Sequence, residues 1–208
     1  MIILPLFIAL FAFLLTYFLL PWWIKYLKRI DLVVKDKNKP GEPLVPLSGG
    51  TVVLCGIIAG LMLFIFIRTF FPGTNIPLSL TTDNLSHLFA VIITILIITL
   101  IGFIDDLLIQ KSKDSSAGLK QWQKPVITIA AAVPLMATHV GVTTMLLPFF
   151  GLVNFSHLYP LLLIPLGVVG AANMVNMLGG FNGMESGMAL IYLGSLGLYA
   201  YTNHRYIA

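Results

Sequence analysis

The chain has 208 residues, of which 58% are hydrophobic and only 10% are charged, and its formal net charge is +4. Soluble globular domains carry about 25% charged residues, so this composition and a mean hydropathy of +0.97 exclude a soluble domain. The single cysteine, Cys55, excludes an internal disulfide and a cysteine-based metal cluster. The chain is therefore predicted to be an integral membrane protein.

Continuous apolar runs of about twenty residues predict spanning helices, whereas a β-barrel would show alternating segments of about ten residues. The first run lacks a basic N-terminal region and is too long for a signal-peptide core, so we interpret it as a retained helix. We expect an all-α, polytopic bundle that forms one membrane domain over residues 1–208. Its six expected spans are 2–24, 51–71, 88–104, 125–140, 160–173 and 188–201. Asn84 or Ser86 is expected to cap the third, which should end at Asp105-Asp106.

The connectors differ sharply in charge. Segments 72–83 and 141–159 contain no lysine or arginine, and the second is expected to lie at the membrane interface. Proline and glycine in 31–50 predict a structured loop. By the positive-inside rule, the side with most lysines is cytoplasmic and the amino terminus lies outside. Ten of the twelve basic residues fall on that side: Lys25, Lys28, Arg29, Lys35, Lys37, Lys39, Lys111, Lys113, Lys120 and Lys124.

Asp105 and Asp106 follow the third apolar run directly. Charges at membrane depth are costly and usually face a cavity, a partner or an ion. Neighbouring helical residues project about 100° apart, so the two side chains cannot both be lipid-facing. Mg²⁺ commonly binds through one or two carboxylates together with substrate phosphates. The pair therefore indicates a metal and phosphate site, and the alternative is a helix that ends in water with solvated acids.

A second polar segment, 173–187, is rich in asparagine and glycine. If the helix continues that far, Asn173 and Asn176 share one face. Amide oxygens are neutral ligands for metals and also bind sugar hydroxyls, while glycines let the backbone approach a ligand. The alternative is a polar turn between two spans. Lysines on the same side are more often anchors for anionic headgroups than ligands.

Three segments in this order match a known family. They are the Lys35-Asp36-Lys37-Asn38-Lys39 loop with Gly49-Gly50, then Gly102 to Asp106 with Gln123-Lys124, and finally 173–187. Together they resemble the polyprenyl-phosphate N-acetylhexosamine-1-phosphate transferases. Gly179 and Asn182 stand where the bacterial branch has aspartates, and Glu185 is added. This resembles the eukaryotic and archaeal dolichyl-phosphate N-acetylglucosamine-1-phosphotransferase branch.

The resemblance implies transfer of N-acetylglucosamine-1-phosphate from UDP-N-acetylglucosamine to a polyprenyl (dolichyl) phosphate, with UMP released. It implies Mg²⁺, with Mn²⁺ as a substitute. The site would lie at the cytoplasmic edge of the plasma membrane in a prokaryote, or of the endoplasmic reticulum in a eukaryote. Membrane lipids are expected partners and nucleic acid is not, and a homodimer is left open.

The resemblance also assigns roles to individual residues. Asp105 and Asp106 form the catalytic pair, Lys124 contacts the diphosphate, and Asn176 is a metal ligand. The remaining candidates bind substrate: Lys35, Asp36, Lys39, Asn173, Asn182 and Glu185.

Two departures from the family pattern are apparent. The family has about ten spans and a later metal-ligating aspartate, so we expect the 208 residues to be an N-terminal part that is inactive alone. Ile109 stands where the eukaryotic branch has an asparagine. The alternatives are a non-catalytic truncated membrane subunit, an enzyme like the bacterial phospho-MurNAc-pentapeptide translocase, and a proton-coupled transporter, which would need polar groups deep in several spans.

Overall fold

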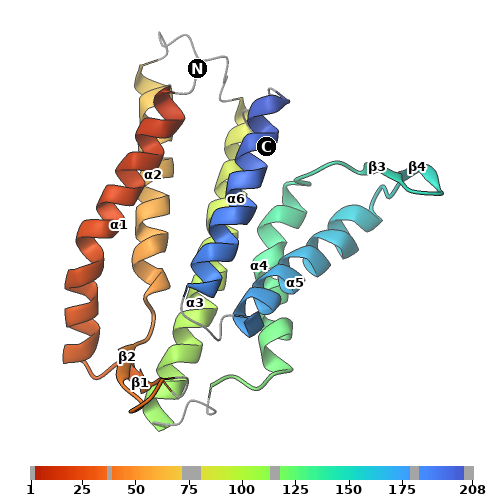
Figure 1. The fold of residues 1–208 in the computed structure, drawn as a ribbon. Helices are drawn as coiled ribbons and strands as arrows, with labels where there is room; N and C mark the ends of the chain where they lie inside the picture. Colours follow the sequence, from red (N-terminus) through yellow and green to blue (C-terminus); the bar gives the residue numbers. More distant parts are fainter. Residues whose placement is uncertain (1–2, 37–38, 72–80, 113–117, 179–182, 204–208) are drawn as a thin grey trace.

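A computed structural model describes residues 3–36, 39–71, 81–112, 118–178 and 183–203 (Figure 1). The structure confirms the all-α class, and each predicted run lies mainly within a helix, although the fourth helix ends at Ala137 and not at Val140. The helices over these residues are α1 Ile3–Arg29, α2 Gly50–Phe70, α3 Thr82–Ser112, α4 Gln123–Ala137, α5 Ile164–Leu178 and α6 Met184–Thr202, with a short π-helix, η1 Tyr159–Leu163, before α5.

Four of the described helical segments are long and apolar enough to cross a membrane: Leu4–Arg29, Gly50–Phe70, Thr82–Lys111 and Tyr159–Leu178. The other two predicted spans fall short of that standard for different reasons. α4 has 15 residues, which corresponds to about 22 Å at 1.5 Å per residue, less than the hydrocarbon core of about 30 Å. α6 has 19 residues but is less apolar.

Two short antiparallel hairpins fill connectors in which no strands were expected. β1 Val33–Lys35 pairs with β2 Leu44–Pro46, and β3 Thr144–Leu147 pairs with β4 Gly151–Asn154. Strands of three or four residues are too short for a period-two pattern to be recognised in the sequence. They form because the backbone groups of a connector need hydrogen-bond partners close to the membrane.

The first two helices approach each other through small residues. A Cβ added at Gly56 of α2 would collide with Thr16 Oγ1 and lie 2.9 Å from the Ala12 carbonyl oxygen on α1. One turn further along α2, a Cβ at Gly60 would lie 3.2 Å from Ala12 Cβ. Helices in a membrane associate largely by close packing of such small side chains. The α1–α2 pair therefore depends on these two glycines.

Helix α3 differs from its prediction at both ends. It continues to Ser112, so Asp105 and Asp106 lie inside the helix and not at its end. The residues after the pair, Leu-Leu-Ile-Gln, favour a helix and prolong it. At the start, Asn84 N donates to Thr81 Oγ1 at 3.2 Å, so the capping side chain is Thr81 and the prediction of Asn84 or Ser86 was wrong.

Contacts between α3 and α4 define two ends of the bundle. Lys124 Nζ lies 2.7 Å from Asp105 Oδ2 at one end, and His87 Nε2 lies 3.1 Å from the Thr138 carbonyl oxygen at the other. We call these the acidic end and the distal end. The β1–β2 hairpin lies at the acidic end and the β3–β4 hairpin at the distal end (Figure 1). In addition, α4 packs on α5, which brings the asparagines of α5 towards Lys124.

Candidate active site

Asp105 is held by the polar loop that joins α3 to α4. Its Oδ1 accepts a hydrogen bond from Leu119 N at 2.6 Å, and its Oδ2 accepts one from Lys124 Nζ at 2.7 Å. A Cβ added at Gly118 would collide with Oδ1, so only glycine lets the backbone pass this close. The side chains of Asp105 and Lys124 are 14% and 26% exposed, so the ion pair is only partly shielded from solvent.

Asp106 is held by Ser48, which lies 58 positions earlier in the loop between α1 and α2, called the first loop below. Ser48 N and Ser48 Oγ both donate to Asp106 Oδ2, at 2.8 and 2.7 Å. Ser48 itself has a left-handed backbone (φ 55), and Trp23 Nε1 donates to its carbonyl oxygen at 3.2 Å. Hydrogen bonds to a charged acceptor are among the strong ones, so Ser48 orients this carboxylate firmly.

A second contact ties the first loop to α3. Gln110 Nε2 donates to the carbonyl oxygens of Ile30 and Asp31, each at 3.1 Å. Gln110 lies on α3 beyond the acidic pair, so it forms this contact only because the helix continues past Asp106. Asp106 and Gln110, about one turn apart on α3, are therefore both hydrogen-bonded to the loop that follows α1.

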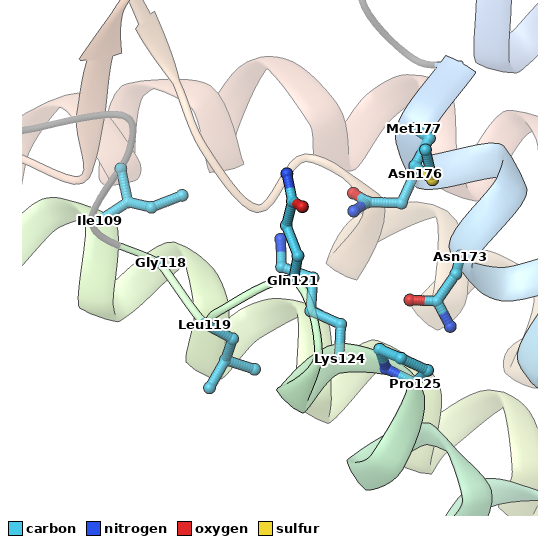
Figure 2. Close-up of a pocket in the computed structure, with 9 residues that line it drawn as sticks. All are labelled: Ile109, Gly118, Leu119, Gln121, Lys124, Pro125, Asn173, Asn176 and Met177. Atoms are coloured by element: carbon cyan, nitrogen blue, oxygen red, sulfur yellow. The ribbon is translucent and has the colours of Figure 1, made fainter.

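A cavity of about 500 Å³ opens between α4 and α5 at the acidic end (Figure 2). Asn173, Asn176 and Met177 come from α5, and Lys124 and Gln121 face them from the start of α4 and the preceding loop. Asn173 Nδ2 donates to the Val169 carbonyl oxygen at 2.8 Å, so part of this amide is committed to its own helix. Ile109, Gly118, Leu119 and Pro125 complete the lining.

A second cavity of about 260 Å³ adjoins the first. Asp105 and Asp106 line it together with Ser48, Thr99 and Asn176. Asn176 lines both cavities, and Lys124, which lines the larger one, is bonded to Asp105, which lines the smaller. The boundary between the two spaces therefore carries one amide, one ammonium and one carboxylate.

The donor set at this boundary suits Mg²⁺. Asp105, Asp106 and Asn176 supply oxygen ligands, which this ion prefers, and they line a single cavity. Within the described part of the chain, no group of three or more His, Cys, Asp or Glu residues is placed to hold a metal by itself. The residues present therefore fit an ion that also takes oxygens from substrate phosphates, as Mg²⁺ commonly does.

The structure gathers half of the predicted site residues at these cavities. Asp105, Asp106, Lys124, Asn173 and Asn176 meet there, although the first two lie on α3, the third on α4 and the last two on α5. The fifth span was predicted to end at Asn173, but α5 extends to Leu178. The condition under which Asn173 and Asn176 share a helix is therefore met.

Four of the other predicted residues lie away from the two cavities. Lys35 pairs with Glu42 at 3.5 Å and Lys39 with Asp36 at 3.2 Å, all within the first loop, and they line neither of the two cavities. Glu185 is exposed in the first turn of α6 and also lines neither. The candidate Asn182 lies outside the described residues. Their assignment as substrate-binding residues stays a prediction.

Ser48 and Gln121 line the cavities but were not among the site residues predicted from the sequence. Ser48 stands beside Gly49-Gly50, but no periodicity in the sequence relates it to Asp106, 58 positions later. Gln121 stands between two lysines in a polar loop, where a solvated side chain is the ordinary expectation. For both residues, only the tertiary fold shows that the side chain belongs to the site.

These features define a class of protein. It is a helical membrane protein in which carboxylates, a lysine and amides surround two adjoining cavities at one end of the bundle. The sequence model of glycosyl transferase family 4 matches residues 88–208, which include most of these side chains. The chain belongs to glycosyl transferase family 4.

Individual relatives cover nearly the whole chain. A Saccharolobus solfataricus protein provisionally named UDP-N-acetylglucosamine–dolichyl-phosphate N-acetylglucosaminephosphotransferase is 32% identical over 203 residues, 97% of this chain and 55% of the relative. A Dictyostelium discoideum protein of the same name is 28% identical over 89% of this chain and 45% of the relative. A Streptococcus agalactiae phospho-N-acetylmuramoyl-pentapeptide-transferase is 32% identical over 94% of this chain and 57% of the relative. The chain spans about half the length of these relatives.

Proposed function

We propose that the protein, in its intact form, transfers N-acetylglucosamine-1-phosphate from UDP-N-acetylglucosamine to a polyprenyl or dolichyl phosphate. The observation that carries the proposal is the boundary between the two cavities, where Lys124, Asp105 and Asn176 meet. Phosphoryl transfer needs the attacking and leaving oxygens roughly in line, and groups that stabilise the charge between them. Two adjoining cavities with such groups at their common wall suit that demand.

The chemistry of each cavity favours one substrate. The larger cavity has the ammonium of Lys124 and the amides of Gln121, Asn173 and Asn176, which suit a diphosphate and a sugar. Its volume of about 500 Å³ falls in the usual range for small-molecule sites. The smaller cavity has both carboxylates and lies where the apolar part of α3 ends. A phosphate tethered to a lipid would reach this point from the membrane.

The reaction follows from these placements. An oxygen of the acceptor phosphate attacks the sugar-bearing phosphorus of the donor, the bond from that phosphorus to the bridging oxygen breaks, and UMP leaves. Asp106, oriented by Ser48, is placed to align the acceptor phosphate or to accept its proton. Lys124 is placed to offset the charge that gathers on the diphosphate, which is the usual source of catalysis in phosphoryl transfer.

Mg²⁺ would be held by Asp105, Asp106 and Asn176 together with phosphate oxygens. When bound, the ion would polarise a phosphoryl oxygen and neutralise negative charge. Asp105 is bonded to Lys124 and to Leu119 N, so the lysine and the loop keep its carboxylate in a fixed orientation. We further propose that the acidic end faces the cytoplasm, because the lysine-rich connectors lie there.

The test is transfer of labelled sugar phosphate by the intact protein in membranes that contain dolichyl phosphate. With UDP-N-acetylglucosamine and Mg²⁺ we expect a lipid-linked diphosphate sugar, which EDTA abolishes. UDP-N-acetylmuramoyl-pentapeptide is a second donor to compare, because the Streptococcus relative carries that activity in its name. Product from this second donor alone would show that UDP-N-acetylglucosamine is not the donor substrate.

Two variants of α3 serve as probe and control in the same assay. Asp105→Asn changes the ion pair at the acidic end, while Asp83→Asn changes an exposed acid in the first turn of the same helix. Loss in the first with retention in the second supports the proposed site. A folded protein that gives no product from either donor would contradict the proposed reaction. Product from the 208 residues alone would contradict the expectation that they are inactive.

A further inference from the structure

The β3–β4 hairpin at the distal end projects away from the helices (Figure 1). Between Val140 and Leu158 the chain contains no aspartate, glutamate, lysine or arginine. The turn of the hairpin presents Phe149, which is fully exposed, and Phe150, which is 80% exposed. Neither phenylalanine is used by the proposed reaction, which takes place at the acidic end.

One face of the hairpin continues this apolar surface. Leu146 and Leu152 are cross-strand partners and are 76% and 75% exposed. Two positions further from the turn on each strand, the partners on the same face are Thr144 and Asn154. The face therefore changes from apolar at the turn to polar at the base.

The base of the hairpin lies near the membrane boundary. Thr138, just after α4, contacts His87 of α3, and about 18 residues of α3 separate His87 from Asp105. That distance is about 27 Å at 1.5 Å per residue, close to the hydrocarbon thickness of about 30 Å. Because the polar acidic end marks one boundary, the hairpin base falls at or just inside the opposite one.

Two physical limits then fix where the hairpin can lie. A two-stranded sheet has open edges, and unpaired backbone groups are not tolerated in hydrocarbon, so the strands cannot enter the membrane core. A surface of four large apolar side chains at this level is equally unsuited to bulk water. The interfacial layer, where apolar side chains meet lipid and the backbone meets headgroups and water, satisfies both limits.

We propose that the β3–β4 hairpin is an interfacial anchor, with Phe149, Phe150, Leu146 and Leu152 inserted among the lipids of the leaflet opposite the acidic end. The absence of charged side chains from 140–158 favours lipid over a charged protein partner. The hairpin joins α4 to η1 and α5, the elements that carry Lys124, Asn173 and Asn176 at their other ends. The anchor thus helps to fix the depth of these two helices in the bilayer.

Depth measurement by site-directed spin labelling tests this without any assay of activity. The intact protein is reconstituted in phosphatidylcholine vesicles with Cys55, the one cysteine of these 208 residues, replaced by serine. A nitroxide is attached in turn to Phe150→Cys, Leu146→Cys and, as the control, Glu42→Cys. Glu42 belongs to the charged hairpin at the acidic end, where its side chain is 54% exposed. Collision rates with oxygen and with a water-soluble nickel chelate are then compared.

The labels at positions 150 and 146 are expected to collide several-fold more often with oxygen than with the nickel chelate. The label at position 42 is expected to collide more often with the nickel chelate than with oxygen. A label at 150 that behaves like the one at 42 would place the hairpin in water and overturn the proposal. Protection from both reagents with dipolar broadening between labels would overturn it too, since a second copy would then cover the hairpin. The two labelled hairpin positions guard against an artefact of one substitution.

Discussion

The two hairpins of this protein have the same architecture and opposite chemistry. The connector of β1 and β2 at the acidic end carries Lys35, Asp36, Lys39 and Glu42, which form ion pairs with one another. The connector of β3 and β4 at the distal end has no charged residue, and its turn is formed by phenylalanine. Backbone pairing alone therefore does not reveal what a hairpin does in a membrane protein.

The difference lies in what each hairpin contacts. The first loop reaches back to α3, where Ser48 donates two hydrogen bonds to Asp106 and Gln110 bonds the loop's start. The β3–β4 hairpin instead turns away from the bundle (Figure 1). Charged connectors can organise a site because they stay in water, whereas an uncharged one is free to meet lipid. If this contrast holds, substitutions at the acidic end lower activity far more than matched substitutions at the distal end.

The largest effect is expected from the acidic pair. Asp106→Asn removes the charge that would align or deprotonate the acceptor, and general base catalysis typically contributes about 10²–10⁴-fold. We expect activity to fall at least about a hundredfold in the membrane transfer assay. Asp83→Asn, at the distal end of the same helix, should stay near the parent rate. Equal losses in both variants would show that an acid on α3 matters for folding and not for the site.

Lys124→Met should lower turnover by about ten- to a hundredfold, because the diphosphate loses a charged partner and Asp105 is left without its counter-ion. Lys120→Met provides the control in the same loop, since the Lys120 side chain lines neither cavity. Rates for both come from the transfer assay at saturating donor. If the two lysines proved equally tolerant, the ammonium at the cavity boundary would have no part in the reaction.

Ser48→Gly should lower kcat by about tenfold with KM little changed. The variant keeps the backbone N–H and suits the left-handed backbone, but loses the hydroxyl bond to a charged carboxylate, worth about 1.5–3 kcal/mol. Ser156→Gly is a matched control at the distal end, since Ser156 also has a left-handed backbone (φ 43). Steady-state kinetics of both variants separate orientation of Asp106 from a general effect of glycine. A parallel rise in KM would argue against a role confined to positioning.

The smallest effect on activity is expected from the contact between α1 and α2, which lies away from both hairpins. Gly56→Ala forces a methyl group against Thr16 and Ala12, and overpacking typically costs about 1–3 kcal/mol. We expect a lower thermal unfolding midpoint in detergent, with nearly normal turnover in the molecules that remain folded. Gly167→Ala on α5, whose added Cβ meets nothing within 4 Å, should not lower the midpoint. If Gly167→Ala lowered the unfolding midpoint and Gly56→Ala did not, the close α1–α2 contact at Gly56 would be contradicted.

Much of the site was accessible from the sequence because charges are rare in it. With only eight acids in 208 residues, the adjacent Asp105 and Asp106 were conspicuous, and the asparagine-rich segment after the fifth run was equally so. Ser48 was not accessible in this way, because a serine beside two glycines is the ordinary composition of a turn. The extension of α3 past Asp106 was also missed, since a charged pair after an apolar run looks like a helix end.

By itself, the sequence determined the membrane class, the helical runs and the side on which charged groups gather, because hydropathy and the cost of burying charge act locally along the chain. Only the tertiary structure decided that Lys124 meets Asp105, that Ser48 holds Asp106, and that Asn176 stands between two cavities. Ser48 and Asn176, which line the same smaller cavity, are 128 positions apart in the sequence. These relations arise from how α3, α4 and α5 pack, and no local pattern encodes that packing.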